Sequence, residues 1–90
     1  MADRSIRYVE AVTEAANAVV ERMVSYKKTQ GLSDEKFARV IGKTKNTVHR
    51  WQTGEVRPPC QMLALALAQL EHEAGLVWDP DRCGHVIVEL

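Results

Sequence analysis

Two short helical patterns separated by a single glycine, Gly42, constrain this chain more than any other feature. Ser33 can cap a first helix, because its hydroxyl accepts hydrogen bonds from free backbone N–H groups in the first turn. Gly42 can take the left-handed conformation that ends a helix, and Thr44 can cap the next one. The apolar residues expected to face inward are Phe37, Ala38, Ile41, Val48 and Trp51. Residues 32–58 are therefore predicted to form two helices that meet at a tight turn.

The second of these helices would carry polar side chains on the face opposite its buried residues. Amide, guanidinium and imidazole groups suit the DNA major groove, whose base edges present distinct donor and acceptor patterns. The pattern therefore predicts a helix-turn-helix that binds double-stranded DNA. The residues expected to contact bases are Lys45, Asn46, His49 and Arg50. The residues expected to contact phosphates are Lys43, Thr44, Thr47, Thr53 and Arg57. For any single base-contacting residue, a phosphate contact or a free surface position is an equally good interpretation.

The residues of this motif resemble a known family. Ala38, Gly42 and Val48 are spaced like the small residue, the turn residue and the apolar residue of the Cro/lambda-repressor-like (Xre-type) helix-turn-helix domains. The segment 51–58 is similar to the W-E-x-G-x-x-x-P ending of those domains, and the resemblance covers roughly residues 17–72. It implies a small helical domain that binds DNA as a two-fold dimer.

The chain has no net charge, but basic residues gather in the predicted motif. Residues 36–54 contain no acidic side chain and five basic ones, namely Lys36, Arg39, Lys43, Lys45 and Arg50. Such a patch is the electrostatic footprint of phosphate binding, and the alternative is an ordinary solvated surface.

Two positions depart from the family: Asp34 stands where a glutamine often supports a phosphate contact, and Lys43 stands where an apolar residue is common. A carboxylate would repel a phosphate, which affects that contact but not the fold.

The remaining segments complete a mainly helical chain. From about Arg4 to Gln30, apolar residues recur at three- and four-residue steps without proline or glycine, which predicts one long amphipathic helix or two nearly continuous ones. The apolar segment from Met62 to Leu70 predicts a buried helix that ends near Gly75. After it, two β-prone segments separated by proline, aspartate and glycine residues predict a hairpin.

We therefore expect one domain over residues 1–90, a four- to five-helix lambda-repressor-like helix-turn-helix fold with an extended N-terminal helix and a short C-terminal β-hairpin. Residues 1–16 would be the helical extension, 17–75 the core and 76–90 the β tail. An isolated hairpin is marginal in water, so the tail should pair with another copy or pack on the helices. The residues expected to form a dimer interface are Trp78, Val86, Ile87, Val88 and Leu90. The alternative is a tail that caps the core of its own monomer.

Membrane, metal and catalytic functions find little support in the sequence. The longest apolar run, residues 62–68, is far shorter than the roughly 20 residues of a membrane span. The first residues lack the pattern of a secretory signal, so we expect a cytoplasmic protein. Cys60 and Cys83 are not expected to form a disulfide in that compartment. Cys83 and His85 could supply two metal ligands, whereas a closed zinc site needs four, so no metal is expected. The sequence also shows no glycine-rich phosphate loop and no paired catalytic carboxylates, so neither a cofactor nor enzymatic activity is expected.

These observations predict a sequence-specific regulator that binds double-stranded DNA as a homodimer on an inverted-repeat operator. Repression by occupying promoter DNA is implied by the resemblance, as in small phage and mobile-element regulators of the family. One alternative is an antitoxin-like or accessory autoregulator that also binds a partner protein. Another is an adaptor that has the same fold but does not bind DNA.

Overall fold

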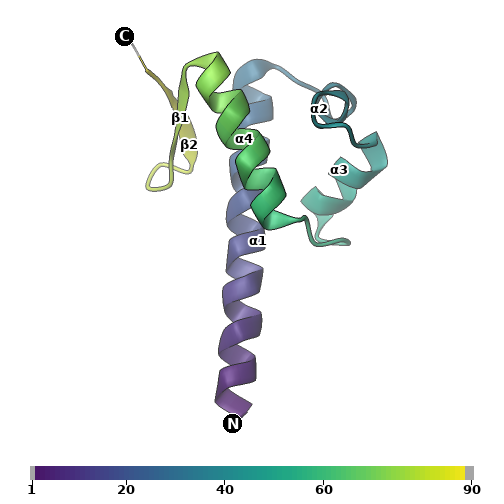
Figure 1. Ribbon diagram of the computed structural model, residues 1–90, viewed down its shortest axis with the longest axis vertical. Helices are drawn as coiled ribbons and strands as arrows, with labels where there is room; N and C mark the ends of the chain where they lie inside the picture. Colours follow the sequence, from purple (N-terminus) through teal and green to yellow (C-terminus); the bar gives the residue numbers. More distant parts are fainter. Residues whose placement is uncertain (1, 89–90) are drawn as a thin grey trace.

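The computed structural model describes the backbone of residues 2–88 and the side chains of residues 14–88, and it is mainly α-helical with one small antiparallel sheet (Figure 1). The elements are α1 (Ala2–Gln30), α2 (Asp34–Ile41), α3 (Lys45–Thr53), α4 (Cys60–Ala74), β1 (Leu76–Asp79) and β2 (Gly84–Ile87). The mainly α class and the C-terminal hairpin are thus confirmed. The predicted dimerisation residue Leu90 lies outside the described residues.

The first helix, α1, is continuous over 29 residues, which decides between the one-helix and two-helix predictions. Its N-terminal half extends beyond the other elements, and its C-terminal half lies beside α4 and the hairpin (Figure 1). The apolar residues that this C-terminal half buries are Ala16, Val19, Met23 and Tyr26. Their three- and four-residue spacing places them on one face of the helix. Within residues 2–88, no helix combines the length and apolar character needed to cross a membrane.

Local capping defines the two short helices as the sequence predicts. The Ser33 hydroxyl accepts a hydrogen bond from the Lys36 N–H at 3.2 Å, and Thr44 accepts one from the Thr47 N–H at the same distance. Between the two helices, Gly42 has φ of +73°, a left-handed conformation that a side chain would strain. The chain therefore leaves α2 and enters α3 within three residues.

The core lies where α2, α3 and α4 meet the C-terminal half of α1. Its fully buried large side chains come from all four helices and are Met23, Phe37, Val48, Leu63 and Leu67. In α4 the expectation of a buried apolar helix was too broad, because Met62 is 48 % exposed and Leu65 is 66 % exposed. A helix that packs on one side buries only a stripe, so the apolar residues on its other face remain in solvent.

The hairpin packs on α1 and α4 of its own chain, as one of the two predicted arrangements had it. Its register pairs Val77 with Val86 and Trp78 with His85. Leu76 is buried, and the rings of Trp78 and His85 lie 5.2 Å apart, so Trp78 makes contacts within its own chain. The exposed apolar side chains of this segment are Val77, Val86, Ile87 and Val88. The strand β2 ends at Ile87, so Val88 follows it, although its N–H still donates to the Gly75 carbonyl at 2.9 Å.

Candidate nucleic-acid interface

The outward face of α3 carries the four side chains that the sequence predicts as base contacts. Lys45, Asn46, His49 and Arg50 are all exposed and lie within six successive positions of the same helix. The side chain of His49 is 66 % exposed and that of Arg50 is 55 % exposed. The structure thus brings an ammonium, an amide, an imidazole and a guanidinium group together on a surface open to a ligand.

The opposite face of α3 fixes the helix on the core. Val48 is fully buried and Trp51 is 4 % exposed. Because these two side chains lie in the packed interior, α3 cannot rotate about its axis without exposing them, at a cost of roughly 1.5 to 3 kcal/mol for each apolar side chain. The exposed polar residues are therefore displayed in one fixed orientation.

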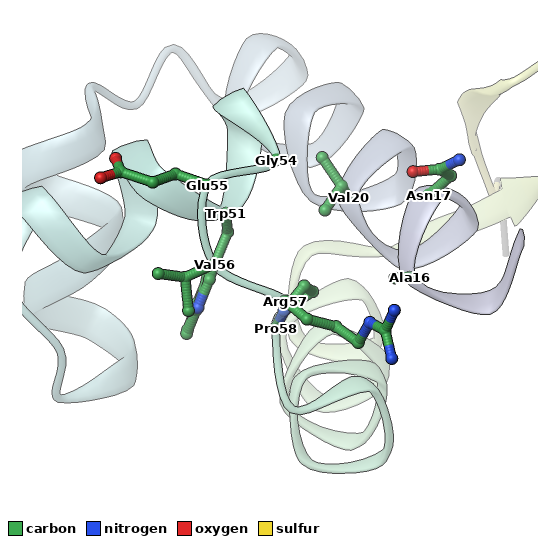
Figure 2. Close-up of a pocket in the computed structure, with 9 residues that line it drawn as sticks. All are labelled: Ala16, Asn17, Val20, Trp51, Gly54, Glu55, Val56, Arg57 and Pro58. Carbon is green, nitrogen blue, oxygen red and sulfur yellow. The ribbon is translucent and has the colours of Figure 1, made fainter. Parts of the chain in front are cut away.

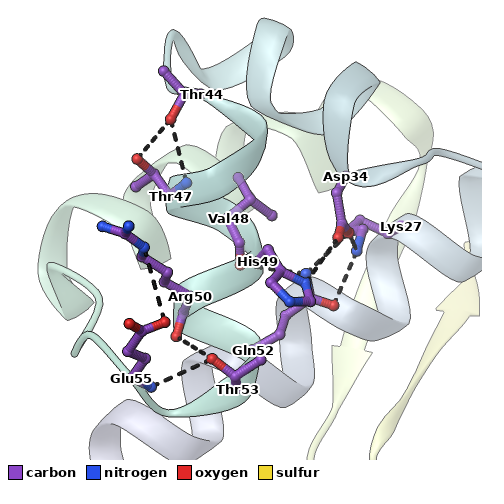
Figure 3. A network of polar contacts seen from close by, with 10 residues as sticks. All are labelled: Lys27, Asp34, Thr44, Thr47, Val48, His49, Arg50, Gln52, Thr53 and Glu55. Carbon is purple, nitrogen blue, oxygen red and sulfur yellow. Dashed lines mark hydrogen bonds and ion pairs between the residues drawn. The ribbon is translucent and has the colours of Figure 1, made fainter.

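A polar cluster of Lys27, Asp34 and Gln52 joins α1, α2 and α3 behind this surface (Figure 3). The Lys27 ammonium donates to Asp34 Oδ1 and, at 3.1 Å, to Gln52 Oε1. The Gln52 amide nitrogen donates to the same Asp34 oxygen at 2.9 Å. The hydrogen bond from Lys27, supported by that from Gln52, holds the pKa of Asp34 below its usual value. Asp34 is thus an ionised carboxylate with its own counter-ion.

The Asp34 carboxylate also approaches the candidate recognition surface. Its second oxygen, Oδ2, lies 3.9 Å from Nδ1 of His49 (Figure 3). At the C-terminal end of α3, Arg50 Nε lies 3.8 Å from a carboxylate oxygen of Glu55. Both partners of the Arg50 pair are mostly exposed, so this ion pair is weak and the guanidinium can exchange it for another anionic partner.

Four of the five predicted phosphate-contacting residues lie at the two ends of α3 and differ in how far their side chains are already engaged. The hydroxyls of Thr44 and Thr47 are 2.8 Å apart at the start of the helix. The Thr53 hydroxyl donates to the Arg50 carbonyl at 3.1 Å and accepts from the Glu55 N–H at 3.4 Å, so it helps to end the helix. Lys43 is exposed in the turn before α3. Thr44, Thr47 and Lys43 thus remain together at the N-terminal end of α3.

Arg57 is set apart from this group. It lines an open pocket of about 390 Å³ between α1 and the α3–α4 loop, together with Asn17 and Trp51. Figure 2 shows its side chain reaching toward α1, whereas Glu55 points away from that helix. The structure therefore does not bring Arg57 to the outward face of α3.

A second polar cluster, which the sequence interpretation missed, attaches the hairpin to the helices. Arg22 Nε donates to Glu71 Oε2 at 2.8 Å and a second guanidinium nitrogen donates to Oε1. His85 Nε2 lies 2.5 Å from Glu71 Oε2, and its Nδ1 lies 2.8 Å from the Ser25 hydroxyl. Burial alone would raise the pKa of Glu71, but the hydrogen bonds from Arg22 and His85 outweigh it and lower the pKa. One signal was present, because Glu71 continues the four-residue spacing of the buried Leu63 and Leu67.

This cluster has the order hydroxyl, imidazole, carboxylate that serine hydrolases share. Here, however, the His85 side chain has no exposed surface, and Arg22 already neutralises Glu71. These features favour a structural role. They also remove His85 as a partner for Cys83 in metal binding, since both ring nitrogens are engaged and the Cys83 thiol donates to the Pro80 carbonyl.

Acid should weaken the fold through these two carboxylates. The pKa values of Asp34 and Glu71 are lowered in the folded protein, so both groups stabilise it above their unfolded pKa, near pH 4, and this contribution is lost as pH falls through the lower folded values. We expect the free energy of unfolding, measured by urea titration, to fall steadily below about pH 4. In Asp34→Asn the free energy of unfolding should fall less steeply with decreasing pH than in the wild type. An equally steep fall would contradict the ion pair between Asp34 and Lys27.

Comparison of the chain with protein-family models, curated proteins and solved structures found no match. The geometry of α3 and the electrostatics around it therefore carry the functional argument.

Proposed function

We propose that this protein is a helix-turn-helix regulator that binds double-stranded DNA by placing the outward face of α3 in the major groove. The observation that carries the proposal is the contrast between the two faces of α3. Val48 and Trp51 fix the helix on the core, and the opposite face presents Lys45, Asn46 and Arg50 to solvent. These side chains offer the donors and acceptors that distinguish base pairs in the major groove.

The surroundings of α3 support binding of a polyanion. Residues 36–54 carry five basic side chains and no acidic one. Asp34, the nearest carboxylate on α2, is paired with Lys27, which offsets the repulsion that an isolated carboxylate would exert on a phosphate. An adaptor that binds only proteins has no need for such a surface, so the basic face favours DNA. Repression, as opposed to activation, rests on the resemblance to the Cro/lambda-repressor-like family alone.

Binding as a homodimer to an inverted repeat is part of the proposal. In two-fold dimers of helix-turn-helix proteins the recognition helices lie about 34 Å apart and meet successive major grooves. The exposed apolar residues of the hairpin, Val86, Ile87 and Val88, are the proposed dimer contacts. The same surface would serve a partner protein in the antitoxin-like alternative, which has the same DNA-binding half.

The dimer contact can be tested without removing the hairpin, whose buried side chains belong to the core. Val86→Glu and Ile87→Glu place charges on exposed positions. Each should change the free energy of unfolding by no more than about 0.5 kcal/mol relative to the wild type, and each should weaken self-association. Sedimentation equilibrium gives the molecular mass of each variant in solution. A dimer that persists in the variant carrying both substitutions would exclude the hairpin as the interface.

Asn46 is expected to govern sequence choice. A side-chain amide can form a bidentate pair with adenine, worth roughly 1 to 3 kcal/mol of discrimination. Asn46→Ala should therefore lower affinity for the preferred duplex about tenfold or more while it leaves binding to random duplex almost unchanged. Titrations of labelled duplexes by fluorescence anisotropy measure both affinities. Equal losses on the two duplexes would contradict the assigned role.

A further inference from the structure

The two carboxylate oxygens of Asp34 face different groups. Oδ1 accepts hydrogen bonds from the Lys27 ammonium and the Gln52 amide, which belong to α1 and α3. Oδ2 is directed toward α3, 3.9 Å from Nδ1 of His49 (Figure 3). A residue of α2 thus faces Nδ1 of an imidazole whose side chain is mostly exposed.

The carboxylate is held in this orientation from both sides. Lys27 is 8 % exposed, and its ammonium also donates to the Gln52 amide oxygen. The Gln52 amide nitrogen donates both to Asp34 and to the Val48 carbonyl of α3. Since Oδ1 accepts from both the Lys27 ammonium and the Gln52 amide, rotation of the carboxylate away from His49 would break two hydrogen bonds in a partly buried cluster.

We propose that Asp34 is a specificity-determining residue that keeps the hydrogen of the His49 imidazole on Nδ1, so that Nε2 meets the DNA as a hydrogen-bond acceptor. A neutral imidazole has one donor nitrogen and one acceptor nitrogen, and an N–H dipole is favoured where it points at negative charge. An acceptor in the major groove selects the exocyclic amino groups of adenine or cytosine. This inference rests on the proposed DNA-binding function and extends it to the base that His49 selects.

The variant Asp34→Asn should reverse the arrangement. Its amide oxygen can still accept from Lys27 and Gln52, which leaves the amide nitrogen, a donor, facing His49. The hydrogen of the imidazole should then move to Nε2, and this donor would pair with guanine O6 or N7, thymine O4 or adenine N7, and no longer with an exocyclic amino group. The exchange alters a single proton position on the recognition surface.

The tautomer can be measured without DNA. Nitrogen-15 NMR of histidine-labelled protein at pH 8.5, where imidazole side chains are ordinarily neutral, identifies which ring nitrogen carries the hydrogen. We expect Nδ1 of His49 in the wild type and Nε2 in Asp34→Asn. A hydrogen on Nε2 in the wild type would overturn the inference, whether or not the variant folds.

Selection of bound sequences from random duplexes measures the consequence. His49→Ala should lose its preference at one base pair of the site. Asp34→Asn should change the preferred base at that same pair by roughly fivefold and keep the preferences elsewhere. A uniform loss of affinity for all sequences would show Asp34 to be merely structural and would contradict the inference.

Glu35→Gln is the matched control. Glu35 lies in the same first turn of α2, is exposed, and pairs only with Arg39 among the described residues, so its replacement removes the same charge without touching α3. In Glu35→Gln the tautomer of His49 and the base preferences should equal those of the wild type. If the wild type enriches no sequence, both the DNA-binding function and the role of Asp34 in base selection are contradicted. If the tautomer of His49 does not change in Asp34→Asn, only the role of Asp34 is contradicted, and the proposal of DNA binding is unaffected.

Discussion

Arg50→Ala is expected to lower the affinity for the preferred duplex by roughly 10- to 100-fold, the range given by a lost bidentate contact to guanine. Arg50 is 55 % exposed on the outward face of α3, and its ion pair with Glu55 is too weak to stabilise the fold much. The substitution should therefore act on binding and leave the unfolding midpoint close to that of the wild type. Fluorescence anisotropy on specific and random duplexes, with urea titration alongside, measures the two effects separately.

Arg82→Ala is the control for charge. Arg82 lies in the turn of the hairpin, which packs on α1 and α4 and not on α3, and its side chain is 79 % exposed beside Asp79. It removes the same single positive charge as Arg50→Ala. We expect its affinity to stay within about twofold of the wild type at 150 mM salt, where charges farther than about 8 Å apart are screened. Equal losses in the two variants would show that net charge, and not the surface of α3, governs binding.

Glu71→Ala is expected to destabilise the fold by about 3 kcal/mol, more than any substitution on the surface of α3. The side chain of Glu71 is 5 % exposed and accepts hydrogen bonds from Arg22 and His85. Its removal leaves a guanidinium and a fully enclosed imidazole without their acceptor, and buried donors without partners are costly. Because His85 belongs to β2, the hairpin should detach from the helices before the rest unfolds.

The matched control is Glu73→Ala on the same helix. Glu73 is exposed, and its carboxylate accepts only from the Gln69 amide among the described residues, so we expect a change below about 0.5 kcal/mol. Urea titration monitored by circular dichroism gives both free energies. Hydrogen exchange of the β1 and β2 amides reports on the hairpin. A loss below about 1 kcal/mol in Glu71→Ala would contradict the role assigned to the cluster.

The caps and turns around α3 could be predicted because their chemistry is local. Ser33 and Thr44 each bond a backbone N–H three residues away, and Gly42 supplies a conformation that other residues resist. The inward and outward faces of α2 and α3 followed from helical periodicity. These features place the candidate site without any knowledge of distant contacts.

The polar clusters could not be predicted from the same patterns. Glu71 meets Arg22 across 49 positions of sequence, and Asp34 meets Gln52 across 18. Such pairs depend on how the helices pack. The spacing of Glu71 with Leu63 and Leu67 indicates that it is buried, but a single sequence does not show which residue it meets. The position of the hairpin was left open for the same reason, since its apolar residues suited either its own helices or another copy. Asp34, which stood out as a departure from the family pattern, is balanced by Lys27, a residue whose part in the site no local pattern indicates.

Selection of bound sequences from a pool of random duplexes by the wild-type protein tests the central claim most directly. We predict enrichment of an inverted repeat whose half-sites are centred about 10 base pairs apart, and binding that weakens steeply as salt rises. A single unrepeated site would keep DNA recognition but exclude the two-fold dimer. No enrichment above the starting pool, with binding that does not depend on salt, would contradict the assignment of α3 as a DNA-recognition helix.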